Sequence, residues 1–274
     1  MNTFRASIKK EITIGRFVIP FRVYGNQGPY LICLNGVQQS MAMWHSVARR
    51  FSSSYRIVLF DLPGQGKGRV LTGDPYLSLD EQVNIVYNLI ENSQFDDDIT
   101  LCTASWGGII ALVFAVKYPL LVRRLILAGI GTKPNPKMIE TIQKGLSIDT
   151  KNRGEIAEIL IESFGQNLPE VIKKKIMSQF HNMSEENLRG FYNHGVFILS
   201  ADSLSNLVDL QKIQAETFII RGEMDTIIDS EDVCSLASKI PNCKIKIIKG
   251  AGHFLHLERE DIFDVYQDIL EGRC

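Results

Sequence analysis

Short apolar runs alternate with amphipathic stretches along most of the chain. Runs such as Tyr30–Leu34 are apolar without interruption, which is typical of strands buried on both faces. The runs predict strands at 11–15, 17–24, Tyr30–Leu34, Arg56–Phe60, Asp98–Cys102, Val122–Ala128, Glu216–Ile220 and Lys244–Ile248. Helical spacing predicts helices at Leu77–Ile90 (capped by Ser78), Trp106–Tyr118, Ser230–Ile240 and 259–271. Repeated strand–helix units indicate an α/β fold with a mostly parallel sheet and helices on both faces.

The segment 132–212 differs, because strand-like runs are almost absent from it. Apolar periodicity predicts helices at Ile139–Gly145, Gly154–Phe164, Leu168–Phe180, Glu185–Leu199 and Leu204–Lys212. We expect this segment to be a helical lid over the carboxyl edge of the sheet. The predicted organisation is therefore a core over 1–131, a lid over 132–212, and the second part of the core over 213–274.

Composition limits the classes of function. A chain of 274 residues fits one large domain with an insert. Its 45% hydrophobic and 22% charged residues are ordinary for a globular protein, and a net charge of −1 gives no reason to expect binding to nucleic acid. No apolar run reaches the ~18 residues of a membrane span, and the first 15 residues do not resemble a signal peptide, so we expect a cytoplasmic protein.

The cysteines give no sign of a metal or redox site. They are five in number and widely scattered, at Cys33, Cys102, Cys234, Cys243 and Cys274. None has CxxC spacing, so we expect reduced, mostly structural thiols, with Cys102 packed in a buried strand. No set of His, Cys and carboxylates has metal-ligand spacing, and no dinucleotide or Walker motif is present. The sequence therefore predicts neither a metal nor a cofactor.

Ser105 lies between a predicted buried strand and an apolar helix. This is the context of a nucleophile elbow, a tight turn that projects the serine hydroxyl above the sheet. Such a turn needs small neighbours, which Ala104 and Gly107 provide. Thr103 is bulkier than the glycine usual at its position. An ordinary serine in a strand–helix turn is the alternative interpretation.

Two later loops supply the partners that a catalytic serine needs. Asp225 follows one late strand and His253 follows the next, after glycines. The order Ser, Asp, His is that of the α/β-hydrolases and differs from the orders of the other triad folds. We predict that His253 takes the proton of Ser105 and that Asp225 fixes the imidazole tautomer. Asp229 and Glu223 are competing candidates for the acid, and Asp61 is predicted to be structural.

A tetrahedral oxyanion requires two hydrogen-bond donors. The backbone N–H of Trp106, directly after the nucleophile, is one, and the loop after the strand Tyr30–Leu34 is expected to supply the other. Our prediction for that donor is the N–H of Val37. Asn35, Gly36 and Phe254 are predicted to contact the substrate.

The remaining histidines and one basic run have simpler interpretations. His45 and His256 are expected to pack locally, while His181 and His194 fall in the lid. Lys173–Lys175 is expected to be a solvated helix face, with docking of an acidic carrier protein as the alternative. Apolar lid residues such as Ile159 suit packing, the wall of an acyl-chain tunnel, or both.

Several of these motifs together resemble the 3-(3-hydroxyalkanoyloxy)alkanoate synthases of rhamnolipid biosynthesis. They resemble equally the 3-hydroxyacyl-carrier-protein transacylases and thioesterases of polyhydroxyalkanoate metabolism, which share the α/β-hydrolase fold. The motifs are Leu34-Asn35-Gly36, Phe60-Asp61-Leu62-Pro63, Ala104-Ser105-Trp106-Gly107-Gly108-Ile109 and Gly252-His253-Phe254-Leu255-His256-Leu257-Glu258. The transacylases resemble one another in a histidine followed five residues later by aspartate. Here that spacing is met only with glutamate, at His253 with Glu258 and at His181 with Glu186 in the lid.

The resemblance implies a substrate and a reaction. The substrates would be 3-hydroxyacyl chains carried as thioesters on acyl-carrier protein or coenzyme A. Ser105 would accept the acyl group, and the 3-hydroxyl of a second unit would attack it to give a dimeric lipid ester. Attack by water would make the protein a thioesterase or carboxylesterase instead. A non-catalytic ligand receptor on the same fold is a third possibility.

Overall fold

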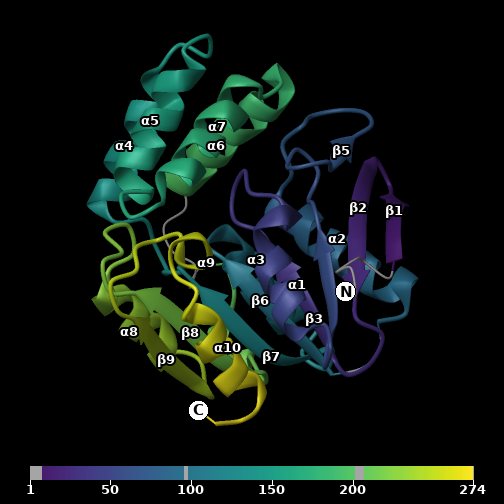
Figure 1. The fold of residues 1–274 in the computed structure, drawn as a ribbon. Helices are drawn as coiled ribbons and strands as arrows, with labels where there is room; N and C mark the ends of the chain where they lie inside the picture. Colours follow the sequence, from purple (N-terminus) through teal and green to yellow (C-terminus); the bar gives the residue numbers. More distant parts are fainter. Residues whose placement is uncertain (1–7, 96–97, 201–206, 274) are drawn as a thin grey trace.

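The chain folds around one twisted sheet with helices on both sides (Figure 1). The structure is a computed structural model that describes residues 8–95, 98–200 and 207–273. Its strands are β1 (Ile8–Ile14), β2 (Phe17–Tyr24), β3 (Tyr30–Leu34), β4 (Arg56–Phe60), β5 (Arg69–Val70), β6 (Ile99–Ala104), β7 (Val122–Ala128), β8 (Glu216–Gly222) and β9 (Cys243–Ile248).

The helices alternate with these strands, apart from one run of four. They are α1 (His45–Phe51), α2 (Leu79–Ser93), α3 (Trp106–Lys117), α4 (Pro136–Ser147), α5 (Arg153–Phe164), α6 (Glu170–His181), α7 (Glu185–Ser200), α8 (Ser230–Ser238), α9 (Leu255–Glu258) and α10 (Ile262–Leu270). Two short 3-10 helices lie at Met41–Trp44 and Leu210–Lys212. No helix in the described part of the chain is long and apolar enough to cross a membrane.

The sheet has the order β1-β2-β4-β3-β6-β7-β8-β9, with β5 paired to β2. From β4 to β9 every neighbouring pair is parallel, while the pairs made by β2 are antiparallel. The predicted mostly parallel sheet is therefore confirmed. Because all parallel strands point the same way, their carboxyl ends meet at one edge, where loops from distant parts of the sequence come together.

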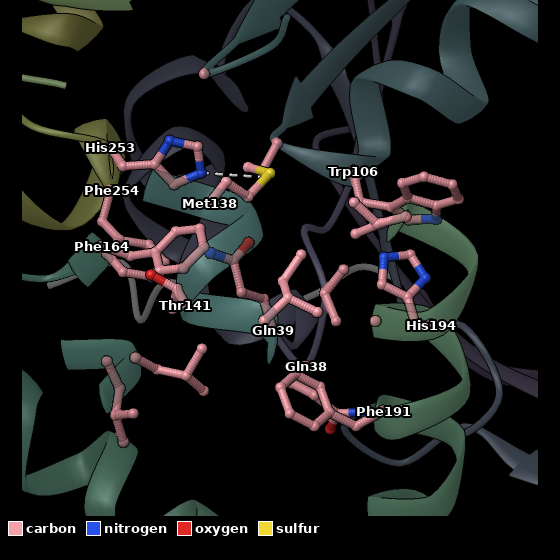
Figure 2. Close-up of a pocket in the computed structure, with 18 of the residues that line it drawn as sticks. Gln38, Gln39, Trp106, Met138, Thr141, Phe164, Phe191, His194, His253 and Phe254 are labelled. Carbon is pink, nitrogen blue, oxygen red and sulfur yellow. Dashed lines mark hydrogen bonds between the residues drawn. The ribbon is translucent and has the colours of Figure 1, made fainter. Parts of the chain in front are cut away.

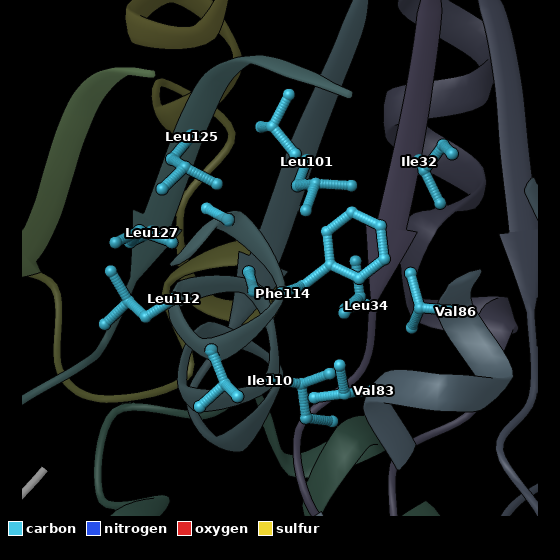
Figure 3. Close-up of a cluster of buried hydrophobic side chains, with 14 of the residues drawn as sticks. Ile32, Leu34, Val83, Val86, Leu101, Ile110, Leu112, Phe114, Leu125 and Leu127 are labelled. Carbon is cyan, nitrogen blue, oxygen red and sulfur yellow. The ribbon is translucent and has the colours of Figure 1, made fainter. Parts of the chain in front are cut away.

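Alternate residues of each central strand enter two separate apolar layers. In β3, Ile32 and Leu34 face the layer covered by α2, α3 and α8, whereas Leu31 and Cys33 face the layer covered by α1 and α10. Figure 3 shows the first layer, in which Phe114 of α3 packs among side chains of β3 and β6. Burial on both faces is the reason why these strands are apolar without interruption.

Two local predictions are resolved in opposite ways. The predicted cap of α2 is confirmed: the Ser78 hydroxyl accepts from the N–H of Glu81, and the Glu81 carboxylate accepts from the N–H of Ser78. The helix predicted over Leu204–Lys212 is wrong over 207–212, where the chain forms turns and a single 3-10 helix. Its first three residues, 204–206, lie outside the described residues.

The predicted closing helix also differs, because the chain forms α9 and α10 instead of one helix over 259–271. The backbone of Arg259 is extended, with φ −137° and ψ 129°, which ends α9. The Arg259 guanidinium pairs with Asp261 across the break at 2.8 Å. The separate α9 belongs to the loop that carries His253.

Helices α4–α7 form an insert between β7 and β8, which Figure 1 shows as a group at one end of the molecule. Asn135 caps α4 by accepting from the N–H of Met138 at 2.9 Å. The insert has a small apolar cluster of its own, centred on Ile156, Phe180 and Leu188. The residue boundaries 131/132 and 212/213 of the insert stay predictions.

Candidate active site

Ser105 occupies a strained turn between β6 and α3. Its φ of 49° and ψ of −117° fall where a residue with a side chain is rarely found. The turn is crowded, since a Cβ on Gly107 would lie 2.5 Å from the carbonyl oxygen of Leu34. A glycine is therefore required at 107, while Thr103 is tolerated because its side chain points into the buried interior. The strain holds the Ser105 side chain above the carboxyl edge of the sheet.

The structure brings Ser105, His253 and Asp225 together in one chain of hydrogen bonds. Nε2 of His253 lies 3.1 Å from Oγ of Ser105, and Nδ1 of His253 lies 2.9 Å from Oδ2 of Asp225. The other oxygen of Asp225 accepts from the N–H groups of Ile227 and Ile228. Each carboxylate oxygen is thus occupied, which fixes the orientation of the acid.

The two competing acids are engaged elsewhere. Asp229 accepts from the side-chain amide of Asn135 at 2.9 Å, and Glu223 accepts from the N–H of Gly250 at 2.9 Å. Neither makes a described contact with the imidazole. Asp61 is buried and accepts from the N–H groups of Met41 and Lys67, which fits its predicted structural role.

Burial and charge oppose each other at the paired acid and base. Burial by itself lowers the pKa of His253, but the charge and hydrogen bond of Asp225, with the charge of Glu258, raise that pKa above its usual value. Burial would raise the pKa of Asp225, but His253 and the two backbone donors hold it below its usual value. The pair therefore stabilises an imidazolium next to a carboxylate, the ion pair that general-base catalysis by His253 would form.

The loop of His253 is held by Glu258, whose carboxylate accepts from the N–H groups of Gly252 and Phe254. These two donors flank the histidine. Glu258 therefore positions His253 through the backbone, a role that the sequence analysis did not assign to it. The only sequence signal for this role was that Glu258 lies five residues after His253, at the spacing where the transacylases have an aspartate.

Val37 and Trp106 carry the two backbone N–H groups that are predicted to bind the oxyanion. Val37 and Trp106 both line the same cavity as Ser105. Within the described residues, neither of their N–H groups donates a hydrogen bond to the protein. The close approach of Gly107 to Leu34 places the start of α3 against the loop that carries Val37. This arrangement suits a pair of donors to an oxyanion.

The predicted substrate contacts are divided by the structure. Phe254 lines the cavity, but Asn35 and Gly36 do not. The side chain of Asn35 is buried, donates to the carbonyl of Phe60 at 3.1 Å and accepts from the indole N–H of Trp44 at 2.9 Å. Substrate contact by the Asn35 side chain does not fit this arrangement, because its hydrogen bonds are used to hold the loop that presents Val37.

A cavity of about 530 Å³ extends from Ser105 and His253 into the insert. Apolar side chains of the insert form much of its wall: Ile142, Ile156, Ile159, Leu160, Phe164 and Phe197. Phe164 of α5 packs edge-on against His253, with ring centroids 5.4 Å apart. Figure 2 shows His253, Phe164 and Phe254 on one side of the cavity, with Trp106 and His194 on the other. The volume is within the range of small-molecule pockets.

The other histidines are placed in four different ways. His256 is buried and bonds through Nε2 to the hydroxyl of Tyr266 at 2.6 Å, so its predicted local packing is confirmed. His45 packs against Tyr24, and His181 is exposed. His194 lines the cavity, which the sequence analysis missed. The sequence does contain a signal for this position, because His194 lies three residues after Phe191 and three residues before Phe197. This spacing places all three side chains on one face of α7.

Comparison with known proteins agrees with this architecture. Residues 29–158 match a family model described as the alpha/beta hydrolase fold. A thermophilic esterase from Thermogutta terrifontis superposes with a TM-score of 0.80 at 22% identity, covering 97% of this chain and 99% of that protein. The chain has the α/β-hydrolase fold.

Two curated relatives of this chain are named for acyl chemistry. An (R)-3-hydroxydecanoyl-ACP:CoA transacylase from Pseudomonas aeruginosa is 25% identical, covering 93% of this chain and 86% of the relative. A monoacylglycerol lipase from Homo sapiens is 26% identical, covering 89% and 75%. The predicted resemblance to the transacylase group is therefore confirmed, as is the prediction that the chain is an enzyme of this fold.

Proposed function

We propose that the protein is an acyltransferase that uses 3-hydroxyacyl thioesters and forms an acyl-enzyme on Ser105. The observation that carries the proposal is the hydrogen-bonded set Ser105, His253 and Asp225 at the end of a mostly apolar cavity. The similarity to a 3-hydroxydecanoyl transacylase supports the substrate class.

The first half-reaction would transfer the acyl group to the enzyme. His253 accepts the proton of Ser105 as Oγ attacks the thioester carbonyl, and Asp225 stabilises the imidazolium. The oxyanion receives hydrogen bonds from the N–H groups of Val37 and Trp106. Collapse of the tetrahedral intermediate expels the thiolate of the carrier, which takes the proton from His253.

The second half-reaction would release the acyl group to an acceptor. His253 removes the proton of an acceptor hydroxyl or thiol, which attacks the Ser105 ester. Collapse of the second tetrahedral intermediate breaks the bond between the acyl group and Oγ of Ser105, and Oγ takes the proton back from His253. If the acceptor is the 3-hydroxyl of a second 3-hydroxyacyl unit, the product is a 3-(3-hydroxyalkanoyloxy)alkanoate. If it is the thiol of coenzyme A, the reaction is transacylation.

The electrostatics of the cavity favour an anionic carrier. Lys133 and Lys175 line the cavity and are exposed at its rim, and none of the described residues that line it is Asp or Glu. The phosphopantetheine arm shared by acyl-carrier protein and coenzyme A carries a phosphate. Lysine binds phosphate through the point charge of its ammonium group. Lys173 is less available, since it pairs with Glu170 at 2.8 Å.

Hydrolysis is a second candidate, favoured by the similarity to a lipase and to an esterase. The same acyl-enzyme would form, but water would attack it, and the protein would be a thioesterase or carboxylesterase. The two functions share every residue of the triad and differ only in the acceptor.

The deciding experiment is mass spectrometry of the products formed from 3-hydroxydecanoyl thioesters of acyl-carrier protein and of coenzyme A, each alone and together. A dimeric hydroxy-fatty ester, or movement of the acyl group between carriers, is the result expected for an acyltransferase. Free 3-hydroxydecanoic acid as the sole product would reassign the protein to hydrolysis. The Ser105→Ala variant, incubated in parallel, is the control for uncatalysed release.

A further inference from the structure

His194 is a buried polar side chain without a function in the mechanism above. It lies on α7, is 8% exposed and lines the cavity that contains Ser105. Its Nε2 is shielded from solvent and has no hydrogen-bond partner among the described residues. Buried polar atoms are hydrogen-bonded in the great majority of cases, so the unpaired ring nitrogen of this cavity-lining residue needs an explanation beyond packing.

The position of His194 is fixed by aromatic neighbours. Its ring packs edge-on against Trp106, with ring centroids 4.3 Å apart. The ring of Phe197 packs against the same indole, with centroids 5.8 Å apart. The indole N–H does not serve His194, because it donates to the side chain of Gln82 at 2.8 Å. Figure 2 shows His194 beside Trp106, on the opposite side of the cavity from His253. The imidazole therefore stands next to the residue that directly follows the nucleophile.

The protonation state of His194 decides what it can bind. Burial lowers its pKa to about 4, so the ring is neutral near pH 7. A neutral imidazole offers one donor and one acceptor, which match a hydroxyl, and it offers no charge for a phosphate or carboxylate.

Several other polar side chains of the cavity wall have partners within the protein. The Thr141 hydroxyl donates to the carbonyl of Lys137, and the Tyr192 hydroxyl donates to the carbonyl of Ile148. The side-chain oxygen of Gln39 accepts from the N–H of Gly36. His194 differs from these groups, because its Nε2 has no partner among the described residues.

We propose that His194 hydrogen-bonds the hydroxyl of the bound acyl chain and so selects 3-hydroxyacyl over unsubstituted acyl substrates. The inference rests on the proposed function, which places the acyl carbonyl at Ser105. Ser105 and His194 line the same cavity, and the ring of His194 packs against Trp106, the residue that directly follows the nucleophile. An unsubstituted chain would leave Nε2 unpaired, which is how a site built for a hydroxyl rejects the analogue that lacks it.

The test compares the p-nitrophenyl esters of 3-hydroxydecanoic and decanoic acids, because their cleavage requires no carrier and water serves as the acceptor. The ratio of the two kcat/KM values should favour the hydroxy ester in the wild type and fall by roughly 10-fold or more in His194→Phe. His194→Gln, which keeps a donor and an acceptor, should retain part of the preference. His181→Phe, an exposed histidine of α6, is the matched control and should leave the ratio unchanged.

Selectivity and simple structural damage give different readouts. A structural role for His194 would lower both kcat/KM values and leave their ratio unchanged, and this result would overturn the proposal. So would a wild type without preference for the hydroxy ester. The ring ¹⁵N shifts of His194 in the Ser105→Ala variant provide a second measurement: they should move on addition of 3-hydroxydecanoate and not of decanoate, and equal movement would also overturn it.

Failure of the proposed function would look different again. If no acyl-enzyme forms from thioesters but the ester ratio depends on His194, the protein is a hydroxyacyl esterase and the assignment of His194 stands. If thioester transfer is confirmed and the ratio does not depend on His194, the proposed function stands and the assignment of His194 is wrong.

Discussion

Two helices of equal length show how differently the core and the insert use apolar residues. Helices α3 and α5 both have 12 residues, but α3 buries nine of them and α5 buries two. Helix α3 packs into the sheet, where side chains such as Phe114 are covered completely. Helix α5 leaves Ile159, Leu160 and Phe164 partly exposed toward the cavity. The core covers its apolar area almost completely, whereas the insert leaves much of its apolar area facing the cavity.

This difference suggests a division of roles, in which the core carries the catalytic residues and the insert determines which substrates bind. Ser105 and His253 are carried by loops at the edge of the packed sheet, so their geometry depends on rigid elements. Side chains of the insert form the wall that the acyl chain would contact. Changes in the core should therefore affect stability or the chemical step, whereas changes in the insert should affect which substrates bind.

The largest expected effect is that of removing the nucleophile. Ser105→Ala should reduce kcat for a p-nitrophenyl ester by roughly 10⁴-fold or more, because a triad acts as a unit. Circular dichroism should show an intact fold. Activity within tenfold of the wild type would contradict the assignment of Ser105 and, with it, the separation of chemistry from selection.

Asp225→Asn should have the next largest effect, a loss in kcat of about 10⁴-fold. The neutral amide cannot stabilise the imidazolium or hold the required tautomer. Asp229→Asn is the matched control, since Asp229 bonds to Asn135 and not to His253. A large loss in the control and a small one in Asp225→Asn would move the acid to position 229.

In the core, Phe114→Ala should lower the free energy of unfolding by about 3–5 kcal/mol, because it leaves a cavity in a fully packed layer. The midpoint of urea unfolding measures this loss. At urea concentrations below the unfolding transition, kcat per folded molecule should stay near that of the wild type. A stability loss below 1 kcal/mol would show that this layer is less tightly packed than the structure indicates.

The pH profile should show how the acid–base pair is tuned. His253 must be neutral to accept a proton, so kcat/KM should fall as the pH drops below its raised pKa. Glu258→Gln removes a charge that raises this pKa, and the acidic limb should shift to lower pH. Glu260→Gln, on the exposed segment that follows, is the control. An unshifted limb in Glu258→Gln would limit the role of Glu258 to its hydrogen bonds.

The smallest effect is expected from the insert. Ile159→Ala should change the free energy of unfolding by about 1 kcal/mol or less, because the side chain is only partly buried. KM for ten-carbon substrates should rise several-fold, while kcat for short-chain esters should not change. Val171→Ala, at an exposed position of α6, is the control. A stability loss as large as that of Phe114→Ala would remove the distinction between the two regions.

Much of the site could be predicted from the sequence because its signals are local. The turn at Ser105 lies between a continuous apolar strand and an apolar helix, and the loops of Asp225 and His253 follow late strands in the order typical of the fold. Parallel strands bring such loops to one edge whatever the details of packing. The apolar period therefore determined most strands and helices, and the turn context and chain order of the three residues indicated that they group together.

Only the tertiary structure decided how individual side chains are used. Asn35 is committed to Phe60 and Trp44, and Glu258 holds the backbone on both sides of His253. His194 faces a cavity, whereas His256, also a buried histidine, has a partner in Tyr266. The physical reason is that a periodic pattern shows which side chains are buried, whereas their hydrogen-bond partners come from distant segments whose distances are set by packing.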